Sequence, residues 1–294
     1  MRKSRAPWVL MAPFLLLFAL TFLLPIIIAI GQSFTTVSRK GLLGEKGATL
    51  RFAGFDNYAA ALGNPNFVAS IGRMLLFGVV QVTVMIVAAT LLALLLESAS
   101  AKWPGFFRAA YFLPYGIPGV IASILWSFLY VPGLSPVVDV LHLVGVDVDF
   151  LDPSIVLWSI ANIVTWTYTG YNMLIIIAQL KTIPADVYEA AKIDGASPWR
   201  VVRSIQLPLI RPALLLTIIF SIIGTLQLFA EPSVLKGMST GITSEYTPNM
   251  SAYAYAFQYN DIGMAAAEAV IIAVAAFVLS AIALGISSRA GRKP

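Results

Sequence analysis

The chain has no cysteine and only one histidine, His142, among its 294 residues. These absences exclude disulfide frameworks and thiol nucleophiles, and they leave no Cys/His set that could hold a structural zinc ion. Charge is also scarce, because Asp, Glu, Lys and Arg together make up 11% of the residues. An ordinary globular protein has about a quarter. The composition therefore argues against a water-soluble protein and against nucleic-acid binding.

Two kinds of active centre are missing as well. No G-x-x-x-x-G-K-[ST] motif occurs, so the chain has no loop of this type to cradle nucleotide phosphates. A membrane-embedded enzyme would need a nucleophile with its base, or carboxylates with a histidine, at bilayer depth, and no such set is visible. His142 has acidic neighbours, but a lone histidine in a loop is more often unliganded. We expect no cofactor, metal or catalytic site in this chain.

Hydrophobic residues are what the chain has in excess, at 59% of the total with a mean hydropathy of +0.86. A helix needs roughly 20 apolar residues to cross a bilayer core of about 30 Å. Six stretches meet this requirement, at 8–30, 74–96, 109–131, 155–177, 213–235 and 264–286. The sequence thus predicts an all-α, multi-pass membrane protein with six transmembrane helices in a single domain, 1–294.

The distribution of basic residues predicts the orientation of these helices. If six spans alternate in direction, 13 of the 19 Lys and Arg fall on the side that holds both termini, and six fall on the other side. Positive charge accumulates on the cytoplasmic side of membrane proteins. Both termini are therefore expected in the cytoplasm, with outer loops at 31–73, 132–154 and 236–263 and inner loops at 97–108 and 178–212.

The second inner loop, 178–212, contains the start and stop signals of two short helices. Pro184 suits the start of the first helix, and Gly195 suits a left-handed C-terminal cap. Ser197 can cap a second helix, Trp199 with Val202 and Ile205 forms an apolar stripe, and Leu207-Pro208 is expected to end it. We expect this loop to fold into a compact unit, either docked on a partner or packed on itself as a solvated hairpin.

Within this loop, Glu189-Ala190-Ala191 is followed, after three residues, by Gly195, then after nine by Ile205, and then by Leu207-Pro208. This spacing resembles the EAA loop of ABC importer permeases, in the carbohydrate branch of the MalF and UgpA type. Other stretches that resemble the same branch include Gly54–Tyr58 in the first outer loop and Leu113-Pro114-Tyr115 in the third span.

The resemblance implies a MetI-like permease fold in a bacterial inner membrane. It further implies a MalG-like second permease, two ATPase subunits that bind ATP and Mg, and an extracytoplasmic solute-binding protein that delivers a carbohydrate. The loop would be a coupling helix seated in a groove of an ATPase subunit, and its expected coupling residues are Glu189, Ala190, Ala191, Asp194, Gly195, Ile205, Leu207 and Pro208. A permease for a polyol phosphate such as glycerol-3-phosphate, or an ion-coupled secondary transporter, remains an alternative.

Polar and aromatic side chains inside the spans are candidates for the substrate path. Sugar recognition pairs amide or hydroxyl groups with an aromatic surface. Such groups more often bridge neighbouring membrane helices, so both interpretations stay open. The candidates are Asn162, Thr165, Trp166, Thr169 and Asn172 on one face of the fourth span, Trp126 and Tyr130 in the third, and Gln227 and Glu231 in the fifth. The role of Glu268 in the sixth span is left undecided.

Overall fold

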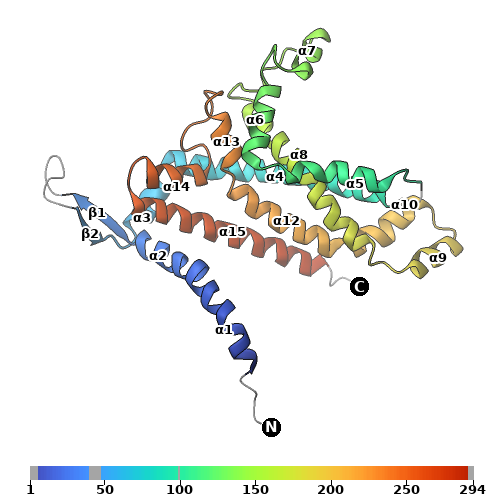
Figure 1. Ribbon diagram of the computed structural model, residues 1–294, viewed down its shortest axis with the longest axis horizontal. Helices are drawn as coiled ribbons and strands as arrows, with labels where there is room; N and C mark the ends of the chain where they lie inside the picture. The colour runs from blue at the N-terminus through green and yellow to red at the C-terminus, as the bar shows by residue number, and fades with distance from the viewer. Residues whose placement is uncertain (1–5, 40–47, 99, 291–294) are drawn as a thin grey trace.

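The computed structural model describes residues 6–39, 48–98 and 100–290, and most of them are helical (Figure 1). The helices are α1 (Ala6–Phe18), α2 (Leu24–Ser33), α3 (Asp56–Gly63), α4 (Pro65–Leu96), α5 (Pro104–Phe112), α6 (Gly119–Leu129), α7 (Pro136–Leu143), α8 (Val156–Leu180), α9 (Ala185–Ile193), α10 (Pro198–Val201), α11 (Leu207–Leu209), α12 (Arg211–Leu226), α13 (Ala230–Leu235), α14 (Pro248–Phe257) and α15 (Ile262–Ala290). Wider or tighter helical turns occur at η1 (Ala19–Leu23), η2 (Leu113–Gly116) and η3 (Val202–Gln206), and two strands at β1 (Thr35–Arg39) and β2 (Ala48–Phe52).

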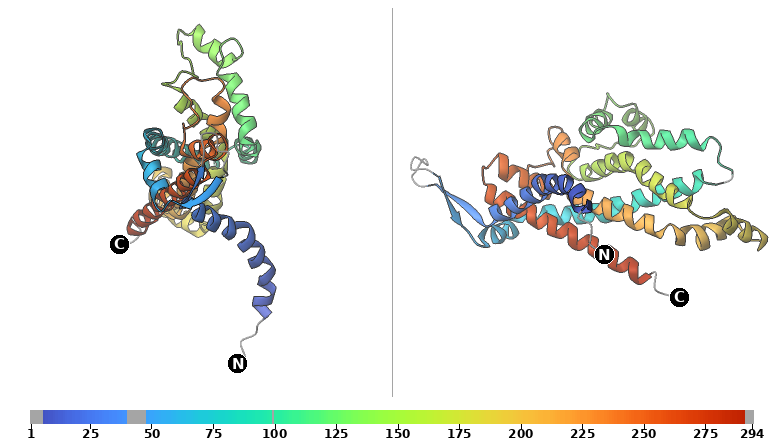
Figure 2. Two further views of the ribbon diagram at one scale, coloured as in Figure 1. Left: turned by 90° about the vertical axis from the view of Figure 1, so that its left-hand side faces the viewer. Right: turned by 60° about the horizontal axis from the view of Figure 1, so that its bottom comes forward.

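The long helices α4, α8, α12 and α15 form an elongated bundle. The hairpin β1–β2 lies at one end of it together with α3 and α14, and α9 and α10 lie at the opposite end (Figure 1). The N-terminal helix α1 points away from the bundle, as the left-hand view of Figure 2 also shows. The predicted outer loops 31–73 and 236–263 therefore gather at one end and the predicted inner loop 178–212 at the other, whereas α7, in the predicted outer loop 132–154, stands apart from both ends (Figure 1).

Four described helices are long and apolar enough to cross a membrane, at Val9–Ser33, Pro65–Leu96, Arg211–Leu235 and Ile262–Gly285. A bent pair, Pro104–Gly116 with Gly119–Leu129, raises the number to five if it counts as one span. The fourth predicted span corresponds to α8, which is 25 residues long. Its polar side chains lower its mean hydropathy, and it is not among the four. The multi-pass prediction is confirmed, while six crossings stay a prediction.

The first two spans are longer than predicted. The side chain of Asn64 caps α4 by accepting from the N–H of Asn66 at 2.9 Å, and Pro65 takes the first helical position, so α4 begins nine residues before the predicted boundary. The N-terminal helix continues to Ser33 through the wide turn η1, which directly precedes the helix segment that contains Pro25. At the start of α4, local capping rather than hydrophobicity sets the boundary.

The hairpin β1–β2 departs from the all-α prediction. Its strands pair antiparallel, from Thr35 opposite Phe52 to Arg39 opposite Ala48, in a region predicted only as an outer loop. Asn57 fixes the hairpin to α3, because its amide donates to the carbonyl oxygens of Ser33 and Thr35 at 2.8 and 2.9 Å. Five-residue strands have too little alternation to be recognised in the sequence.

The core divides into a large cluster, a smaller cluster at the end of the bundle that carries α9 and α10, and a third that consists of Val82, Met85 and Ile86 in α4. Phe67, Phe77 and Ile160 are fully buried in the large cluster, where α4 packs on α8. The smaller cluster joins the C-terminal ends of α4 and α8 and includes Ala93 and Ile176. The ends of α8 and α12 that carry the loop 178–212 are thereby held in place.

Candidate functional site

The first helix of the loop 178–212 begins and ends where the sequence predicted. Helix α9 starts after Pro184 and is closed by Gly195, whose φ of +68° lies in the left-handed region that glycine favours. The N–H of Gly195 donates to the carbonyl of Lys192 at 3.1 Å, and that of Ala196 donates to Ala191 at 2.9 Å. This pair of bonds is a Schellman cap, which gives the chain a sharp turn after α9.

The second helix begins as predicted but does not end at Leu207-Pro208. Ser197 accepts from the N–H of Arg200 at 3.4 Å, with Pro198 in the first position of α10. The N–H of Leu207 bonds to the carbonyl of Val202, five residues back, and this wide turn accommodates the proline. Helical structure then runs on to Leu209, and α12 starts at Arg211, so the predicted stop was wrong.

One face of the loop packs onto the bundle. Ala191 is buried, and Val187, Ile205 and Leu207 contact the smaller core cluster that includes Ala93 and Ile176. The two helices of the loop are also joined directly, because the amide of Gln206 donates to the hydroxyl of Tyr188 at 3.4 Å. The loop is thus a folded unit continuous with α8 and α12, so a force applied to it would reach both helices.

The other face of the loop is open. Glu189 and Gly195 are exposed, as are Ala190, Asp194 and two large apolar side chains, Ile193 at 86% and Trp199 at 69%. The sequence pattern placed Trp199 on an apolar stripe with Val202 and Ile205, whereas the structure turns Trp199 outward. The sequence pattern assigned no role to Ile193. Apolar side chains this exposed beside a glutamate suit contact with another protein chain. The motif residues thus fall on both faces of the unit.

A cavity of about 500 Å³ lies among α4, α8, α12 and the two bent segments. Apart from apolar residues, its described lining comprises amides, hydroxyls, glycines, aromatic rings and one carboxylate. These residues are Gln81, Tyr115, Gly119, Tyr168, Tyr171, Asn172, Ser221, Gly224, Thr225, Gln227 and Glu231.

Two broken helices meet at this cavity, and neither the third nor the fifth span is the continuous helix that the sequence predicted. The third bends by 99° between η2 and α6, where Ile117 is extended, the conformation favoured by the residue before Pro118. The fifth is helical to Leu226, leaves the helix at Gln227, and resumes at Ala230. Irregular backbone at membrane depth is tolerated where it lines a cavity.

The aromatic side chains of the cavity form a stacked group. The rings of Tyr115 and Tyr171 lie parallel with centroids 4.5 Å apart, and Tyr168 meets Tyr115 edge-on at 5.8 Å. Amide groups of Gln81 and Asn172 share the same cavity. Aromatic rings beside hydrogen-bonding groups can bind a solute that has both C–H faces and hydroxyl edges.

Three of the nine predicted substrate-path residues line this cavity, namely Asn172, Gln227 and Glu231. The other six lie elsewhere and contact protein groups. The hydroxyl of Tyr130 accepts a hydrogen bond from Asn162 at 3.0 Å and donates one to the carbonyl of Ser159. The hydroxyl of Thr165 accepts from Gln81, and its carbonyl accepts from Thr169. The rings of Trp126 and Trp166 meet edge-on with centroids 5.7 Å apart. Their role in transport stays a prediction.

The predicted stripe and the observed lining of α8 differ because this helix turns a neighbouring face, not the predicted one, to the cavity. That face carries Val164, Tyr168 and Tyr171, and Asn172 lies at the border between it and the predicted stripe. The sequence held one signal for this face, namely Tyr168 and Tyr171, which lie three residues apart. The neighbouring stripe has more polar side chains, and it was therefore the one predicted to line the path. Which face turns inward depends on the neighbouring helices.

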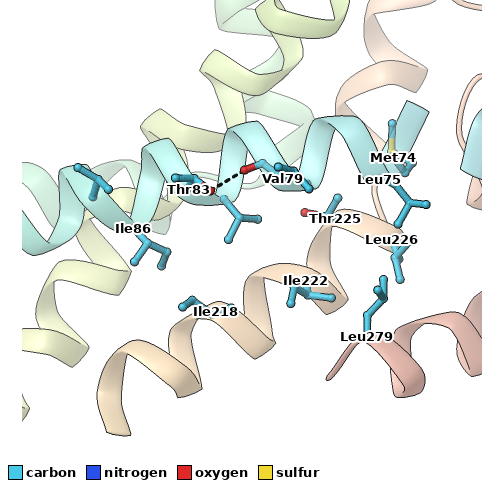
Figure 3. A pocket seen from close by; sticks show the side chains of 13 residues that line it. Met74, Leu75, Val79, Thr83, Ile86, Ile218, Ile222, Thr225, Leu226 and Leu279 are labelled. Atoms are coloured by element: carbon cyan, nitrogen blue, oxygen red, sulfur yellow. Dashed lines mark hydrogen bonds between the residues drawn. The ribbon is translucent and has the colours of Figure 1, made fainter. Parts of the chain in front are cut away.

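A second cavity, of about 400 Å³, opens between α4, α12 and α15 and is almost entirely apolar (Figure 3). Its lining includes Met74, Val79, Ile222 and Leu279. The one hydrogen bond drawn there is internal to α4, from Thr83 to the carbonyl of Val79. This surface suits lipid chains or an apolar helix and offers little to a polar solute.

Long apolar helices, two of them broken around a polar and aromatic cavity, together with a folded loop at one end of the bundle, define a membrane transport subunit. Residues 85–292 match the protein family described as "Binding-protein-dependent transport system inner membrane component". The chain belongs to this family, and it is a transport subunit rather than an enzyme.

Relatives among characterised proteins extend over most of the chain. The lactose transport system permease protein LacF of Rhizobium radiobacter is 34% identical over 254 residues, which cover 84% of this chain and 81% of the relative. The arabinooligosaccharides transport system permease protein AraP of Bacillus subtilis (strain 168) is 29% identical over 97% of this chain and 89% of its own length.

Solved structures show the same fold. A chain of a bacterial alginate ABC transporter, crystallised in complex with an alginate pentasaccharide-bound periplasmic protein, superposes with a TM-score of 0.81. It is 23% identical, and the match covers 98% of this chain and 97% of that one. A chain of the MetNI methionine ABC transporter gives a TM-score of 0.52 at 18% identity, over 77% and 94% of the two chains.

Proposed function

We propose that this chain is the permease subunit of an ATP-driven ABC importer, and that it forms part of the path for a carbohydrate delivered by an extracytoplasmic solute-binding protein. The observation that carries the proposal is the cavity, where stacked tyrosines lie beside amides and a carboxylate at the junction of two broken helices. The names of relatives that transport lactose and arabinooligosaccharides support the same substrate class.

The proposal includes a bacterial inner membrane, six crossings and cytoplasmic termini. The bias of 13 basic residues against six supports this orientation. The loop 178–212 then lies in the cytoplasm, and the hairpin β1–β2 and α14 lie outside, where the binding protein would dock.

Energy would come from two ATPase subunits, which bind the ATP and Mg. The open face of the loop, with Glu189, Ile193 and Trp199, is the surface we assign to an ATPase groove. Since its other face packs on the inner ends of α4 and α8, closure of the ATPases would move these ends as a rigid unit.

A second, MalG-like permease would complete the path. The most apolar stretch of the helix Val9–Ser33 has no residue buried against the rest of this chain, so that stretch is open to lipid or to another subunit, whereas Ser33 at the end of the helix is buried and bonded to Tyr58. The apolar cavity on α4, α12 and α15 offers a further contact surface of the same character.

The experiment replaces Glu189 by Lys, or Gly195 by Trp, in the reconstituted transporter. Glu189→Lys reverses the charge of the open face, and Gly195→Trp forces a β-carbon into the left-handed cap. We expect both variants to insert normally and to lose ATP hydrolysis stimulated by the binding protein. Asp147→Lys, the same charge change at an exposed outer-loop residue, is the matched control and should keep full stimulation.

Normal stimulated hydrolysis in both variants would contradict the coupling assignment. A separate measurement addresses the secondary-transporter alternative. Uptake into vesicles should require internal ATP and the co-expressed ATPase, whereas abolition of uptake by a proton or sodium uncoupler alone would favour ion coupling.

A further inference from the structure

Glu231 is the only carboxylate in the cavity lining that the structure describes, and no Lys, Arg or His stands beside it there. The residue as a whole is 8% exposed. Burying a charge is costly unless it is compensated, so a carboxylate kept in the wall of a transport cavity calls for a physical reason.

The position of Glu231 next to α6 supplies part of the compensation. Its Oε1 lies 3.3 Å from the point where a β-carbon on Gly119 would stand, and Gly119 is the first residue of α6. The N-terminus of a helix carries partial positive charge and free N–H groups, which favour a carboxylate in its ionised form. The absence of a side chain at Gly119 lets the carboxylate come this close.

The cavity therefore presents negative charge and hydrogen-bonding groups but, among its described lining, no cationic group that could pair with an anion. An anionic solute would lose hydration without gaining a counter-charge and would be repelled by Glu231. The hydroxyl groups of an uncharged sugar can instead donate to the carboxylate, while its C–H face lies on the tyrosine rings.

We infer that Glu231 is a specificity-determining residue that makes this cavity select uncharged carbohydrates and reject sugars that carry a carboxylate, sulfonate or phosphate group. This inference rests on the proposed function and narrows it. It disfavours the polyol phosphate alternative on the chemistry of the site.

The lack of cysteine in the chain allows the charge of the cavity to be measured directly. In the assembled transporter, Gln227→Cys places a thiol in the cavity lining, and Ser221→Cys gives a second position on α12. Each thiol is labelled with a cationic and an anionic methanethiosulfonate reagent of similar size. The ratio of the two rates reports the local potential, independently of the binding protein.

We expect the cationic reagent to react faster, and the ratio of rates to fall about tenfold when Glu231→Gln is added. Glu268→Gln is the matched control, since Glu268 is a buried carboxyl in α15 that does not line the cavity, and it should leave the ratio unchanged. Excess lactose or trehalose should slow labelling, and an equal concentration of a uronate disaccharide should not.

Three results would overturn the inference: a ratio that Glu231→Gln leaves unchanged at both positions, no labelling at either position, or equal protection by the uronate. Failure of the proposed function is distinguishable, because it would appear as absence of ATP-dependent uptake of any sugar. Uptake of an uncharged sugar with an unchanged labelling ratio would refute only the role of Glu231.

Discussion

Gly170 in α8 is the place where one added methyl group should have the largest effect. A β-carbon there would lie 1.8 Å from the carbonyl oxygen of Tyr111 and 2.4 Å from its carbonyl carbon. Real β-carbons essentially never come within 3.0 Å of another heavy atom, so α5 would have to move by more than about 1 Å. The obstacle is backbone and cannot rotate away.

Gly170→Ala should therefore separate α5 from α8 and shift Tyr115, which follows α5, away from its stacked position on Tyr171. Overpacking of a core typically costs about 1–3 kcal/mol, and a backbone obstacle puts this substitution at about 3 kcal/mol. For a chain of this size, that loss corresponds to a decrease of about 5 °C in apparent Tm.

The assay is thermal unfolding of the purified transporter, followed by sugar uptake at a temperature well below the transition. Gly72→Ala is the control, since a β-carbon on this exposed glycine of α4 meets nothing within 4 Å, and alanine favours the helix. If Gly170→Ala matches the wild type in both Tm and uptake, the close approach of α5 and α8 is refuted.

Three further predictions concern residues away from the loop 178–212. Ser251→Ala should lower the free energy of unfolding by about 1–3 kcal/mol, because it removes the hydroxyl that donates to the buried carboxyl of Glu268 at 3.0 Å, and Glu268→Gln should change the size of that loss in a double-mutant cycle. The guanidinium of Arg73 lies 4.3 Å from the centroid of the Tyr246 ring and donates to the carbonyl of Tyr246 at 2.5 Å. A lysine cannot make both contacts, so Arg73→Lys should increase proteolysis of the loop before α14 nearly as much as Arg73→Ala does. Hydrogen bonds from the side chain and backbone of the serine two residues on hold the pKa of Asp152 below its usual value. Their stabilisation is thus present above the ordinary pKa of about 3.9 and lost as pH falls through the lowered one, so hydrogen exchange in the turn before α8 should accelerate there in the wild type but not in Asp152→Ala.

Much of the candidate coupling loop could be predicted from the sequence because its signals are local. A proline before the first helix, a glycine after it and a serine before the next each act within a few residues, and the structure contains all three caps. The predicted end at Leu207-Pro208 failed for a specific reason, since a wide turn absorbs the missing N–H of the proline. That accommodation depends on how the segment joins α12.

The substrate cavity was much less predictable. Asn172, Gln227 and Glu231 were identified as polar groups in apolar spans, but Tyr168 and Tyr171 were not, because the choice of the inward face of α8 depends on its neighbours. The bend between η2 and α6 was equally unpredictable from the sequence, since prolines can either kink a span or mark its start.

The sequence by itself determined that this chain is a membrane protein and which loop carries the motif, and its basic residues predict the orientation. Composition, charge bias and capping are properties of short segments or of sums over the chain, so they can be recognised without knowledge of the fold. Only the tertiary structure decided that two broken helices meet at one cavity and that Glu231 lies there with no cationic side chain among the described lining residues. That arrangement depends on contacts between helices far apart in the chain, and no local pattern encodes them.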